Sequence, residues 1–407
     1  MTLVVALAFV GSLLLTPLAK TLAWRFGAVS WPDGDRRLHA RPTALWGGSA
    51  VYLAVLLGVA ASYGPFPGTF NTVVLLSAVG VSTGMLCLLG CYDDRCEMRA
   101  LWKLSGQIVS TLPVILVGCC IQRVVLFGYC VDLGWLGVLF TMGWLVLGIN
   151  AMNLLDGMDG LASTIGITIS VAVAFVASIH GNSEAALMAV ALAGALAGFL
   201  AHNLPPARIY LGDCGSMVIG LAVSVLALQV SLVTPRTANA TIAVALLFVP
   251  LLDTGLAVVR RTFNGQGLFV ADRGHVHHRL LDRGIGIWRV LGLLGGFALL
   301  AGAVAWVVAV SGNELGAWVT LATLTALAIN RRLVGHEEWS VFRRSAAPVV
   351  TRWVRRLRPA ASPNPPHVIA AASPAAASSD TRQAETDSPR LLPAEAADST
   401  GSVGRAA

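Results

Sequence analysis

The chain has 407 residues, of which 56% are hydrophobic and only 12% are charged, and its mean hydropathy is +0.74. A soluble globular domain carries about 25% charged residues, so this composition excludes a soluble fold. The net charge of +7 does not by itself indicate a nucleic-acid partner, because Lys and Arg in membrane proteins fix the topology.

Apolar runs long enough to cross a bilayer recur along the chain, since a helical span needs roughly 17–25 residues. The first run has no preceding basic stretch and no small-residue cleavage site, so it predicts a retained helix rather than a removable signal peptide. The pattern predicts an all-α, polytopic membrane protein with about eleven transmembrane helices. We place them near residues 2–22, 45–63, 70–90, 104–120, 135–152, 161–180, 184–202, 215–233, 240–259, 289–310 and 315–330.

The basic residues of the connecting loops lie almost entirely on one side of the membrane. From Lys20 to Arg289 they fall on one side of the predicted spans, and the other side receives only Arg123 and Arg236. By the positive-inside rule the first side is cytoplasmic, which predicts a bacterial plasma-membrane protein with its N-terminus outside and its C-terminus inside.

The predicted organisation has three parts. Residues 1–330 form a transmembrane catalytic domain, and residues 331–358 form a basic juxtamembrane segment. That segment is interpreted either as a helix lying on the inner leaflet or as a flexible flank. Residues 359–407 are rich in Ala, Ser and Pro and predict a disordered cytoplasmic tail, because such a composition cannot bury enough apolar surface to order itself.

In chain order, the first polar stretch is the basic loop from Asp33 to Thr43, which suits a phosphate or anionic lipid or is simply a positive-inside loop. The second is Asp93-Asp94, at the end of the third apolar run. Two hard oxygen donors at a helix end suit Mg²⁺, although the pair is also consistent with an ordinary acidic loop balanced by Arg95 and Arg99.

The third polar stretch runs from Ile149 to Leu161 and is the densest polar motif at the edge of an apolar run. It places Asn150, Asn153, Asp156 and Asp159 at every third residue, with glycines at 157 and 160. A carboxylate at bilayer depth costs roughly 2.5–3.5 kcal/mol, so the cluster predicts a polar pocket for a cation or polar ligand. A tight 3₁₀ turn would align all four side chains.

The fourth stretch, Asn203 to Ser216, precedes the eighth predicted span and contains Tyr210, Gly212 and Asp213. Asp213 lies near a helix N-terminus, where it either contributes to a ligand site or caps the helix.

Within the ninth predicted span, Asp253 is interpreted as a buried structural pair with Arg260 or as a helix-packing hydrogen bond rather than as a catalytic group.

The most specific loop runs from Asp272 to Arg283. A helix capped by Asp272 would align His275, Arg279 and Arg283 on one cationic face, keep His278 near it and point His277 away. Cationic donors at a helix start favour a phosphate or pyrophosphate site. A zinc site is the alternative, but the spacing lacks a nearby Cys and the usual metalloprotease pattern.

Together these motifs resemble the polyprenyl-phosphate N-acetylhexosamine-1-phosphate transferase superfamily, and they lie within roughly residues 1–330. Its four ordered motifs correspond here to Asp93-Asp94, the Asn150–Leu161 stretch, Gly212-Asp213-x-Gly215-Ser216 and His275-x-His277-His278-Arg279. The form of the histidine motif is similar to the branch that uses UDP-GlcNAc. A transporter or channel is the alternative class, but it would need carboxylates near mid-span in several helices.

The resemblance implies transfer of a sugar 1-phosphate from a UDP-sugar to undecaprenyl phosphate, with release of UMP, at the cytoplasmic face. It implies Mg²⁺, or Mn²⁺ in its place, on Asp213 and Asp156, with Asp93 and Asp94 against the lipid phosphate or the metal. Asp159 and Tyr210 would lie near the uracil. The remaining expected substrate-binding residues are Lys103, Asn150, Asn153, Asn203, His275, His277, His278 and Arg279.

The product would initiate a cell-envelope polysaccharide, and the alternative substrate within this superfamily is the muramoyl-pentapeptide donor. Members of the superfamily often form homodimers, but no pattern in this chain marks a dimer face, and no nucleic-acid partner is expected.

Overall fold

The computed structural model describes residues 1–31, 42–62, 70–263, 265 and 274–330, all within the first of two compact units, Met1–Thr351. The predicted juxtamembrane segment and tail, Asp272 and most of the basic loop after Asp33 lie outside the described residues.

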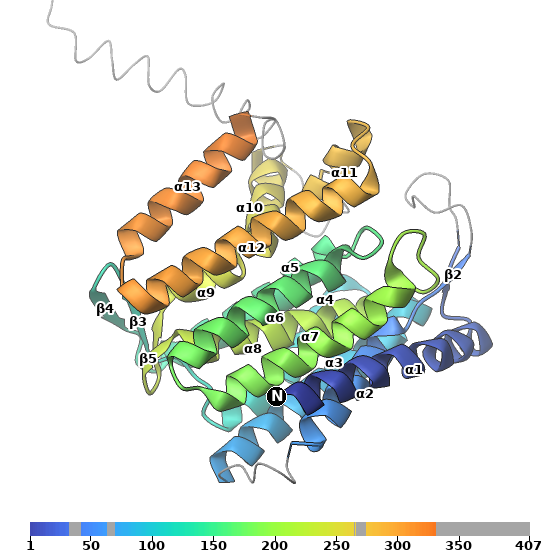
Figure 1. Ribbon diagram of the computed structural model, residues 1–407, viewed down its shortest axis with the longest axis horizontal. Coiled ribbons are helices and arrows are strands. Elements are labelled where there is room, and N and C mark those ends of the chain that lie inside the picture. The colour runs from blue at the N-terminus through green and yellow to red at the C-terminus, as the bar shows by residue number, and fades with distance from the viewer. Residues whose placement is uncertain (32–41, 63–69, 264, 266–273, 331–407) are drawn as a thin grey trace, which may run out of the picture. The chain divides into compact units, whose positions relative to one another are not determined.

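A helix or a bent pair of helices occupies each predicted apolar run (Figure 1). The helices are α1 (Thr2–Phe26), α2 (Gly47–Ala60), α3 (Phe70–Cys96), α4 (Ala100–Leu116), α5 (Leu136–Leu155), α6 (Leu161–Ile179), α7 (Ser183–Asn203), α8 (Asp213–Ser231), α9 (Ala240–Leu246) with α10 (Phe248–Phe263), α12 (Ile287–Ser311) and α13 (Glu314–Asn330). A further short helix, α11 (Val276–Asp282), lies in the histidine motif.

The polytopic α-helical class is confirmed, whereas the number of full spans is not. Within the described ranges, seven helices are long and apolar enough to cross a membrane. The pair α9–α10 is bent by 85° and makes an eighth if it counts as one span. Helices α2, α4 and α13 are apolar but contain only 14, 17 and 17 residues.

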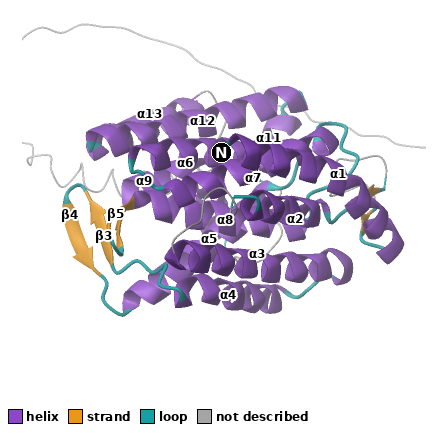
Figure 2. Cartoon of the chain, turned by 60° about the horizontal axis from the view of Figure 1, so that its bottom comes forward, coloured by secondary structure: helices purple, strands orange, loops and turns teal. Residues whose placement is uncertain are grey.

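Two small sheets were not predicted. Strands β1 (Val29–Ser30) and β2 (Thr43–Ala44) pair with each other. A four-stranded sheet contains β3 (Arg123–Leu126), β4 (Tyr129–Asp132), β5 (Leu232–Thr234) and β6 (Thr237–Asn239) in the order β4-β3-β6-β5. This larger sheet lies at the end of the helix bundle opposite α11 (Figures 1 and 2).

The carboxylate of Glu314, at the start of α13, anchors this sheet to the bundle. It accepts hydrogen bonds from the backbone N of Phe127 at 2.6 Å, from Asn239 Nδ2 at 2.9 Å and from Thr241 Oγ1 at 3.0 Å. One buried side chain therefore holds the β3–β4 turn, the end of β6 and the start of α9 together.

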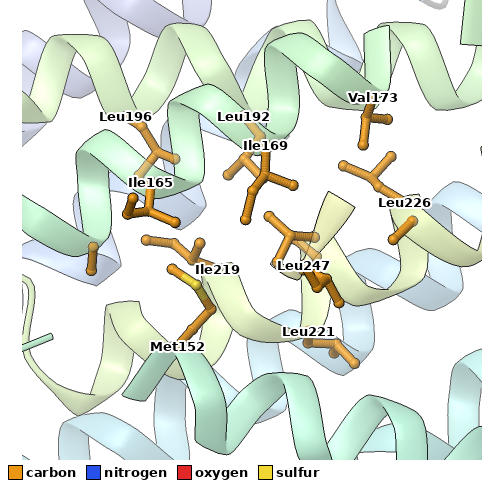
Figure 3. Close-up of a cluster of buried hydrophobic side chains, with 14 of the residues drawn as sticks. Met152, Ile165, Ile169, Val173, Leu192, Leu196, Ile219, Leu221, Leu226 and Leu247 are labelled. Carbon is orange, nitrogen blue, oxygen red and sulfur yellow. The ribbon is translucent and has the colours of Figure 1, made fainter. Parts of the chain in front are cut away.

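Helix α8 is the centre of the packing, because nearly all of its residues are buried inside the protein. Its side chains pack against those of the two preceding helices, α6 and α7, and against Met152 of α5 and Leu247 between α9 and α10 (Figure 3). The labelled cluster contains Ile219, Leu221 and Leu226 of α8 with Ile165, Ile169, Val173, Leu192 and Leu196. The N-terminus of this buried helix, which begins at Asp213, is therefore held firmly within the bundle.

Small residues bring two other helices against the first turn of α8. A Cβ added to Gly48 of α2 would lie 2.0 Å from Gly215 Cα, and one added to Gly90 of α3 would lie 2.3 Å from Cys214 Cα. Glycine permits backbones to approach this closely in membrane bundles. The contact at Gly90 places the last turn of α3, with Asp93 and Asp94, beside Asp213.

Candidate active site

The centre of the candidate site is an ammonium shared by two carboxylates from different helices. Lys103 Nζ, from the first turn of α4, lies 2.8 Å from Asp93 Oδ2 and 2.6 Å from Asp213 Oδ2. The backbone N of Met98 also donates to Asp93 Oδ1, at 2.6 Å. The side chain of Asp93 is 8% exposed and that of Asp213 is 30% exposed, so Asp213 is the member of the group that faces outward.

The other carboxylate oxygen of Asp213 is held by the last turn of α5. Asn153 Nδ2 donates to Asp213 Oδ1 at 2.5 Å and to Ser216 Oγ at 2.8 Å. Helices α3, α4, α5 and α8 therefore each contribute a polar side chain to one cluster, because their ends with these motifs meet at the same end of the bundle.

Asp94 has a different environment from Asp93. Its Oδ1 accepts a hydrogen bond from the backbone N of Asp213 at 2.8 Å, and its Oδ2 accepts one from the N of Cys214 at 3.4 Å. The residue before α8, Gly212, has φ 74° and no side chain to cap the helix. Asp94 supplies that cap from α3, and the expectation that it also lies against a phosphate or metal remains a prediction.

Asp156 is the C-cap of α5 and lies next to the cluster. Its backbone N donates to Asn153 O at 3.3 Å, but its carboxylate makes no hydrogen bond to any described residue. Burial, and then the nearby charges of Asp213 and Asp159, raise the pKa of its carboxyl to about 8. A nearby cation would stabilise the charged form of such a carboxylate and lower its pKa again.

The four polar residues spaced by three do not align on one 3₁₀ turn. Asn150 and Asn153 lie on α5, whereas Asp156 and Asp159 belong to the turn after it. Asn150 Nδ2 donates to Gln107 Oε1 at 2.8 Å and to Val146 O at 2.8 Å, so Asn150 interacts with the bundle interior.

Asn203 and Asp159 tie together the two loops beside the site. Asn203 is 4% exposed; its Oδ1 accepts from the backbone N of Gly160 at 3.0 Å, and its Nδ2 donates to Ile209 O at 3.1 Å. Asp159 Oδ2 accepts from the N of Ala207 at 2.9 Å. These bonds hold the amide of Asn203 on loop backbone, and its predicted contact with phosphate or ribose remains a prediction.

Tyr210 is half-buried in the same loop. Its backbone N donates to Ala44 O at 2.8 Å and its backbone O accepts from the N of Gly47 at 3.0 Å. The loop before α8 is thus attached to β2 and to the start of α2, and the predicted stacking of Tyr210 on a base remains a prediction.

The histidine motif differs from its predicted geometry. Helix α11 begins at Val276, with His275 as its extended N-cap, and not after Asp272. His277 is fully buried and its ring lies against the turn after α5, since a Cβ on Gly157 would lie 2.2 Å from His277 Nε2. His278 and Arg279 are half-buried in the first turn, and the His277 and His278 ring centroids are 4.2 Å apart.

Both ring nitrogens of His277 are buried and have no hydrogen-bond partner among the described residues. Burial, reinforced by neighbouring His278, lowers the pKa of His277 to about 3, so its ring is neutral at physiological pH. A buried polar ring without partners, aimed at a turn with two carboxylates, is typical of a group that completes its hydrogen bonds with a ligand.

His275 points in another direction, into the bundle. Its Nδ1 lies 2.9 Å from Asp253 Oδ2, and the backbone N of Val276 donates to Asp253 Oδ1 at 2.9 Å. The interpretation of Asp253 as a packing hydrogen bond is therefore confirmed, but its partner is the histidine motif rather than Arg260.

The described residues contain no group of three or more His, Cys, Asp or Glu side chains arranged to hold a metal ion. They do bring two carboxylates, Asp156 and Asp213, close enough for their charges to repel. Mg²⁺ in phosphoryl-transfer sites is usually held by one or two carboxylates with waters and substrate phosphates. The donor set therefore fits a magnesium ion shared with a substrate and not an ion held by protein alone.

The structure thus brings together the sequence-predicted residues Asp93, Lys103, Asn153, Asp156 and Asp213, and places His277 against the same turn. Sequence reasoning missed Ser216 and Gln107 as partners of Asn153 and Asn150. Gln107 is a polar residue within an apolar run, which indicates that its side chain bonds another buried polar group. Nothing in the sequence identifies that group as Asn150.

Comparison with known proteins gives a consistent result. Residues 75–231 match glycosyl transferase family 4. The chain is 36% identical to a decaprenyl-phosphate N-acetylglucosaminephosphotransferase of Mycolicibacterium smegmatis, over 65% of this chain and 71% of the relative. It is 31% identical to a Bacillus subtilis protein named as a probable undecaprenyl-phosphate N-acetylglucosaminyl 1-phosphate transferase, over 69% of this chain and 78% of the relative.

Relatives with another named activity also match. A phospho-N-acetylmuramoyl-pentapeptide-transferase of Moorella thermoacetica is 31% identical, over 67% of this chain and 88% of the relative.

Proposed function

The chain belongs to glycosyl transferase family 4, among the polyprenyl-phosphate N-acetylhexosamine-1-phosphate transferases, and we propose that it transfers N-acetylglucosamine 1-phosphate from UDP-GlcNAc to undecaprenyl phosphate or a similar polyprenyl phosphate, releasing UMP. The observation that carries the proposal is the convergence of Asp93, Lys103, Asn153 and Asp213 at one end of a multi-pass bundle. The lipid product would be the first intermediate of a cell-envelope polysaccharide.

The named activities of the relatives favour this sugar over the muramoyl-pentapeptide. Decaprenyl- and undecaprenyl-phosphate N-acetylglucosamine transferases match at up to 36% identity, whereas two phospho-N-acetylmuramoyl-pentapeptide-transferases match at 31% and 26%. The second activity is kept as the alternative to be tested in the same assay.

The chemistry requires little from the protein beyond positioning and charge neutralisation. A phosphate monoester with a second pKa near 6 is mostly dianionic at neutral pH, so the acceptor is already a nucleophile. Its oxygen attacks the β-phosphorus of the UDP-sugar and forms the new P–O bond. The bond from that phosphorus to the bridging oxygen breaks, and UMP leaves with the electron pair.

The residues of the cluster have distinct roles in this scheme. Lys103 holds Asp93 and Asp213 in place and offsets their charge, which keeps two like charges from forcing the helix ends apart. Asp93, fixed by Lys103 and Met98, orients the attacking phosphate or takes its remaining proton. His277, neutral and without a partner among the described residues, offers a ring N–H to a substrate oxygen, and Arg279 supplies positive charge nearby.

Asp156 and Asp213 would hold Mg²⁺ together with the diphosphate of the donor. When bound, the metal would neutralise the charge that spreads over the phosphoryl oxygens and on the leaving UMP. The raised pKa of Asp156 supports this assignment, because a cation is the partner that this carboxyl lacks.

The site is assigned to the cytoplasmic face. The end of the bundle that carries the site also carries Arg95, Arg99, Lys103 and Arg279, and the sheet end carries Arg123 and Arg236. This distribution supports an inside location for the site, with the N-terminus outside and the C-terminus inside.

The decisive experiment measures UMP release and labelled lipid in membranes that contain the protein. UDP-GlcNAc, UDP-GalNAc and UDP-MurNAc-pentapeptide labelled at the β-phosphate are compared, with and without polyprenyl phosphate, and in Mg²⁺ or EDTA. We expect label in the lipid from UDP-GlcNAc only when acceptor and Mg²⁺ are both present. Transfer from the muramoyl donor alone would support the alternative activity.

Two controls sharpen the result. Asp213→Asn should abolish transfer while the protein remains in the membrane, and unchanged UMP release would remove Asp213 from the site. Label that remains on the protein after incubation without acceptor would instead indicate a covalent phospho-aspartate route and contradict direct attack.

A further inference from the structure

Asp253 is a buried carboxylate that the transfer chemistry above does not use. It lies in the second turn of α10, just after the 85° bend from α9, and is 3% exposed. Its neighbours are largely apolar and include Leu155, Leu252 and Leu280. A charge in such surroundings is costly unless it is paired and hydrogen-bonded, so both of its oxygens need partners.

Both partners come from the start of the histidine motif. Oδ2 of Asp253 lies 2.9 Å from His275 Nδ1, and Oδ1 accepts a hydrogen bond from the backbone N of Val276 at 2.9 Å. Helix formation alone does not require this arrangement, because a Ser, Thr, Asp or Asn at position 275 could cap α11 by itself. Here the capping carboxylate comes from another helix, and the local N-cap residue uses its side chain to bind it. The pair therefore specifies where α11 sits as well as where it begins.

The position of α11 is transmitted directly to the carboxylate turn. The rings of His275 and His277 are nearly parallel, with centroids 6.0 Å apart and 13° between their planes. His277 in turn contacts Gly157, between Asp156 and Asp159. The contacts run without interruption from Asp253 through His275 and His277 to the turn after α5.

We propose that Asp253 is a positioning residue for the transfer reaction. It fixes the ring of His275 through Nδ1 and the first amide of α11, and so holds His277, His278 and Arg279 at the correct distance from the Asp156–Asp159 turn. This inference rests on the proposed function, since it assigns the histidine motif to the same reaction.

The test compares Asp253→Ala and Asp253→Asn with Thr254→Val in purified, full-length enzyme. Thr254 is the next residue of α10, is 9% exposed, and has a hydroxyl without a partner among the described residues, so its substitution is a matched control. We expect Asp253→Ala to lower kcat/KM for the UDP-sugar about 10- to 100-fold per folded enzyme, the range typical of residues that orient a functional group. Asp253→Asn keeps one acceptor for the amide of Val276, so its kcat/KM should lie between those of Asp253→Ala and the wild type. The kcat/KM of Thr254→Val should match that of the wild type.

A second measurement separates positioning from folding. Combined with His275→Ala, the Asp253→Ala change should cause a smaller further loss than it causes in the wild type, because the part of its effect that passes through the His275 ring is already absent and only the bond to the amide of Val276 remains to be lost. Losses that multiply in the double variant, or full activity of Asp253→Ala, would overturn the inference.

Amide hydrogen exchange of residues 274–283 tests, independently of catalysis, whether Asp253 holds α11 in place. Asp253→Ala should speed exchange in this segment and leave α8 and α12 protected, and unchanged exchange would also overturn the proposal. If the wild type transfers no sugar phosphate, the proposed function fails, and the exchange result still decides whether Asp253 holds α11.

Discussion

At the scale of single residues, contacts made by glycine determine the shape of the site as much as the charged groups do. Gly212 has a positive φ, and a Cβ there would lie 2.5 Å from Asp94 Oδ2, so a side chain at this position would displace the cap of α8. Gly157 has the same importance for the histidine motif, because the ring of His277 occupies the space that a side chain would need.

The substitution Gly157→Ala tests the position of His277. The new methyl would lie 2.2 Å from His277 Nε2, so the histidine motif or the carboxylate turn must move. We expect at least about a 10-fold loss of UMP release, in line with the cost of disturbing an orienting contact. Gly143→Ala in the preceding helix α5 is the control, since a Cβ there meets nothing within 4 Å, and its activity should be that of the wild type. Equal activity of the two variants would contradict the placement of His277.

Asp156 gives the protein a dependence of stability on pH. The pKa of its carboxyl is raised to about 8 in the folded state, whereas an unfolded aspartate titrates near 3.9. The folded state therefore holds the proton more tightly, and the resulting stabilisation is present below about pH 4 and is lost as the pH rises towards 8.

In the absence of divalent cations, Asp156→Asn should therefore raise the melting temperature above that of the wild type at pH 8 and only slightly at pH 5. We expect a gain of at least about 3 °C at pH 8, the shift that roughly 1 kcal/mol produces in a domain of 150–250 residues. Thermal unfolding in detergent at both pH values measures it, with the exposed Asp282→Asn as control. A gain that is larger at pH 5 than at pH 8 would contradict the assignment.

At the scale of elements, the apolar runs predicted the helices well, because length and hydropathy alone determine where a chain can cross a membrane. The bend between α9 and α10 was not predicted, since the run from residue 240 to 259 is mostly apolar and long enough for a single span. The true start of α11 was not predicted either, because the carboxylate that accepts from its first amide, Asp253, is on another helix. Features that depend on a distant partner leave no local pattern.

The four-stranded sheet was missed for the same reason. Strands of three or four residues become recognisable only when β3 pairs with β6, and those segments are about a hundred residues apart in the chain. The polar motifs of the site, by contrast, were found because charged residues at the ends of apolar runs are conspicuous. The contacts that these residues make with one another, such as the ion pair of Lys103 with Asp93 and Asp213 and the bonds of Asp94 to the first amides of α8, were not predicted.

The hydrogen bonds of Glu314 should stabilise the attachment of the four-stranded sheet to the helix bundle. Its replacement by Ala leaves the donors at Phe127, Asn239 and Thr241 without their acceptor, and each unsatisfied buried group costs roughly 1–3 kcal/mol. We expect the melting temperature to fall by at least about 3 °C while activity per folded enzyme is kept, because the sheet lies far from the site. Thr320→Val is the control, since the exposed hydroxyl of Thr320 donates to Gly316 O of its own helix. Equal melting temperatures of the two variants would contradict the anchoring role.

At the scale of the whole molecule, two natural cysteines report the orientation in the membrane. Cys96, at the end of α3, is exposed beside the site, and Cys130 of β4 is exposed in the sheet at the opposite end. With the site inside the cell, a membrane-impermeant maleimide should label Cys130 in intact spheroplasts and Cys96 only after permeabilisation. Cys130→Ala and Cys96→Ala identify the two signals, and labelling of Cys96 in intact cells would reverse the proposed topology.

The short helices of the bundle have a consequence for the surrounding lipid. Helices α2 and α4, with 14 and 17 residues, are about 21 and 26 Å long, whereas a typical hydrocarbon layer is about 30 Å thick. Both begin at the end of the bundle where Gly48 and Lys103 lie. A bilayer next to elements that are too short thins locally, so headgroups there sink towards the protein. We expect a phosphorylated lipid that enters this thinned region to reach the depth of the carboxylates without being pulled out of the membrane.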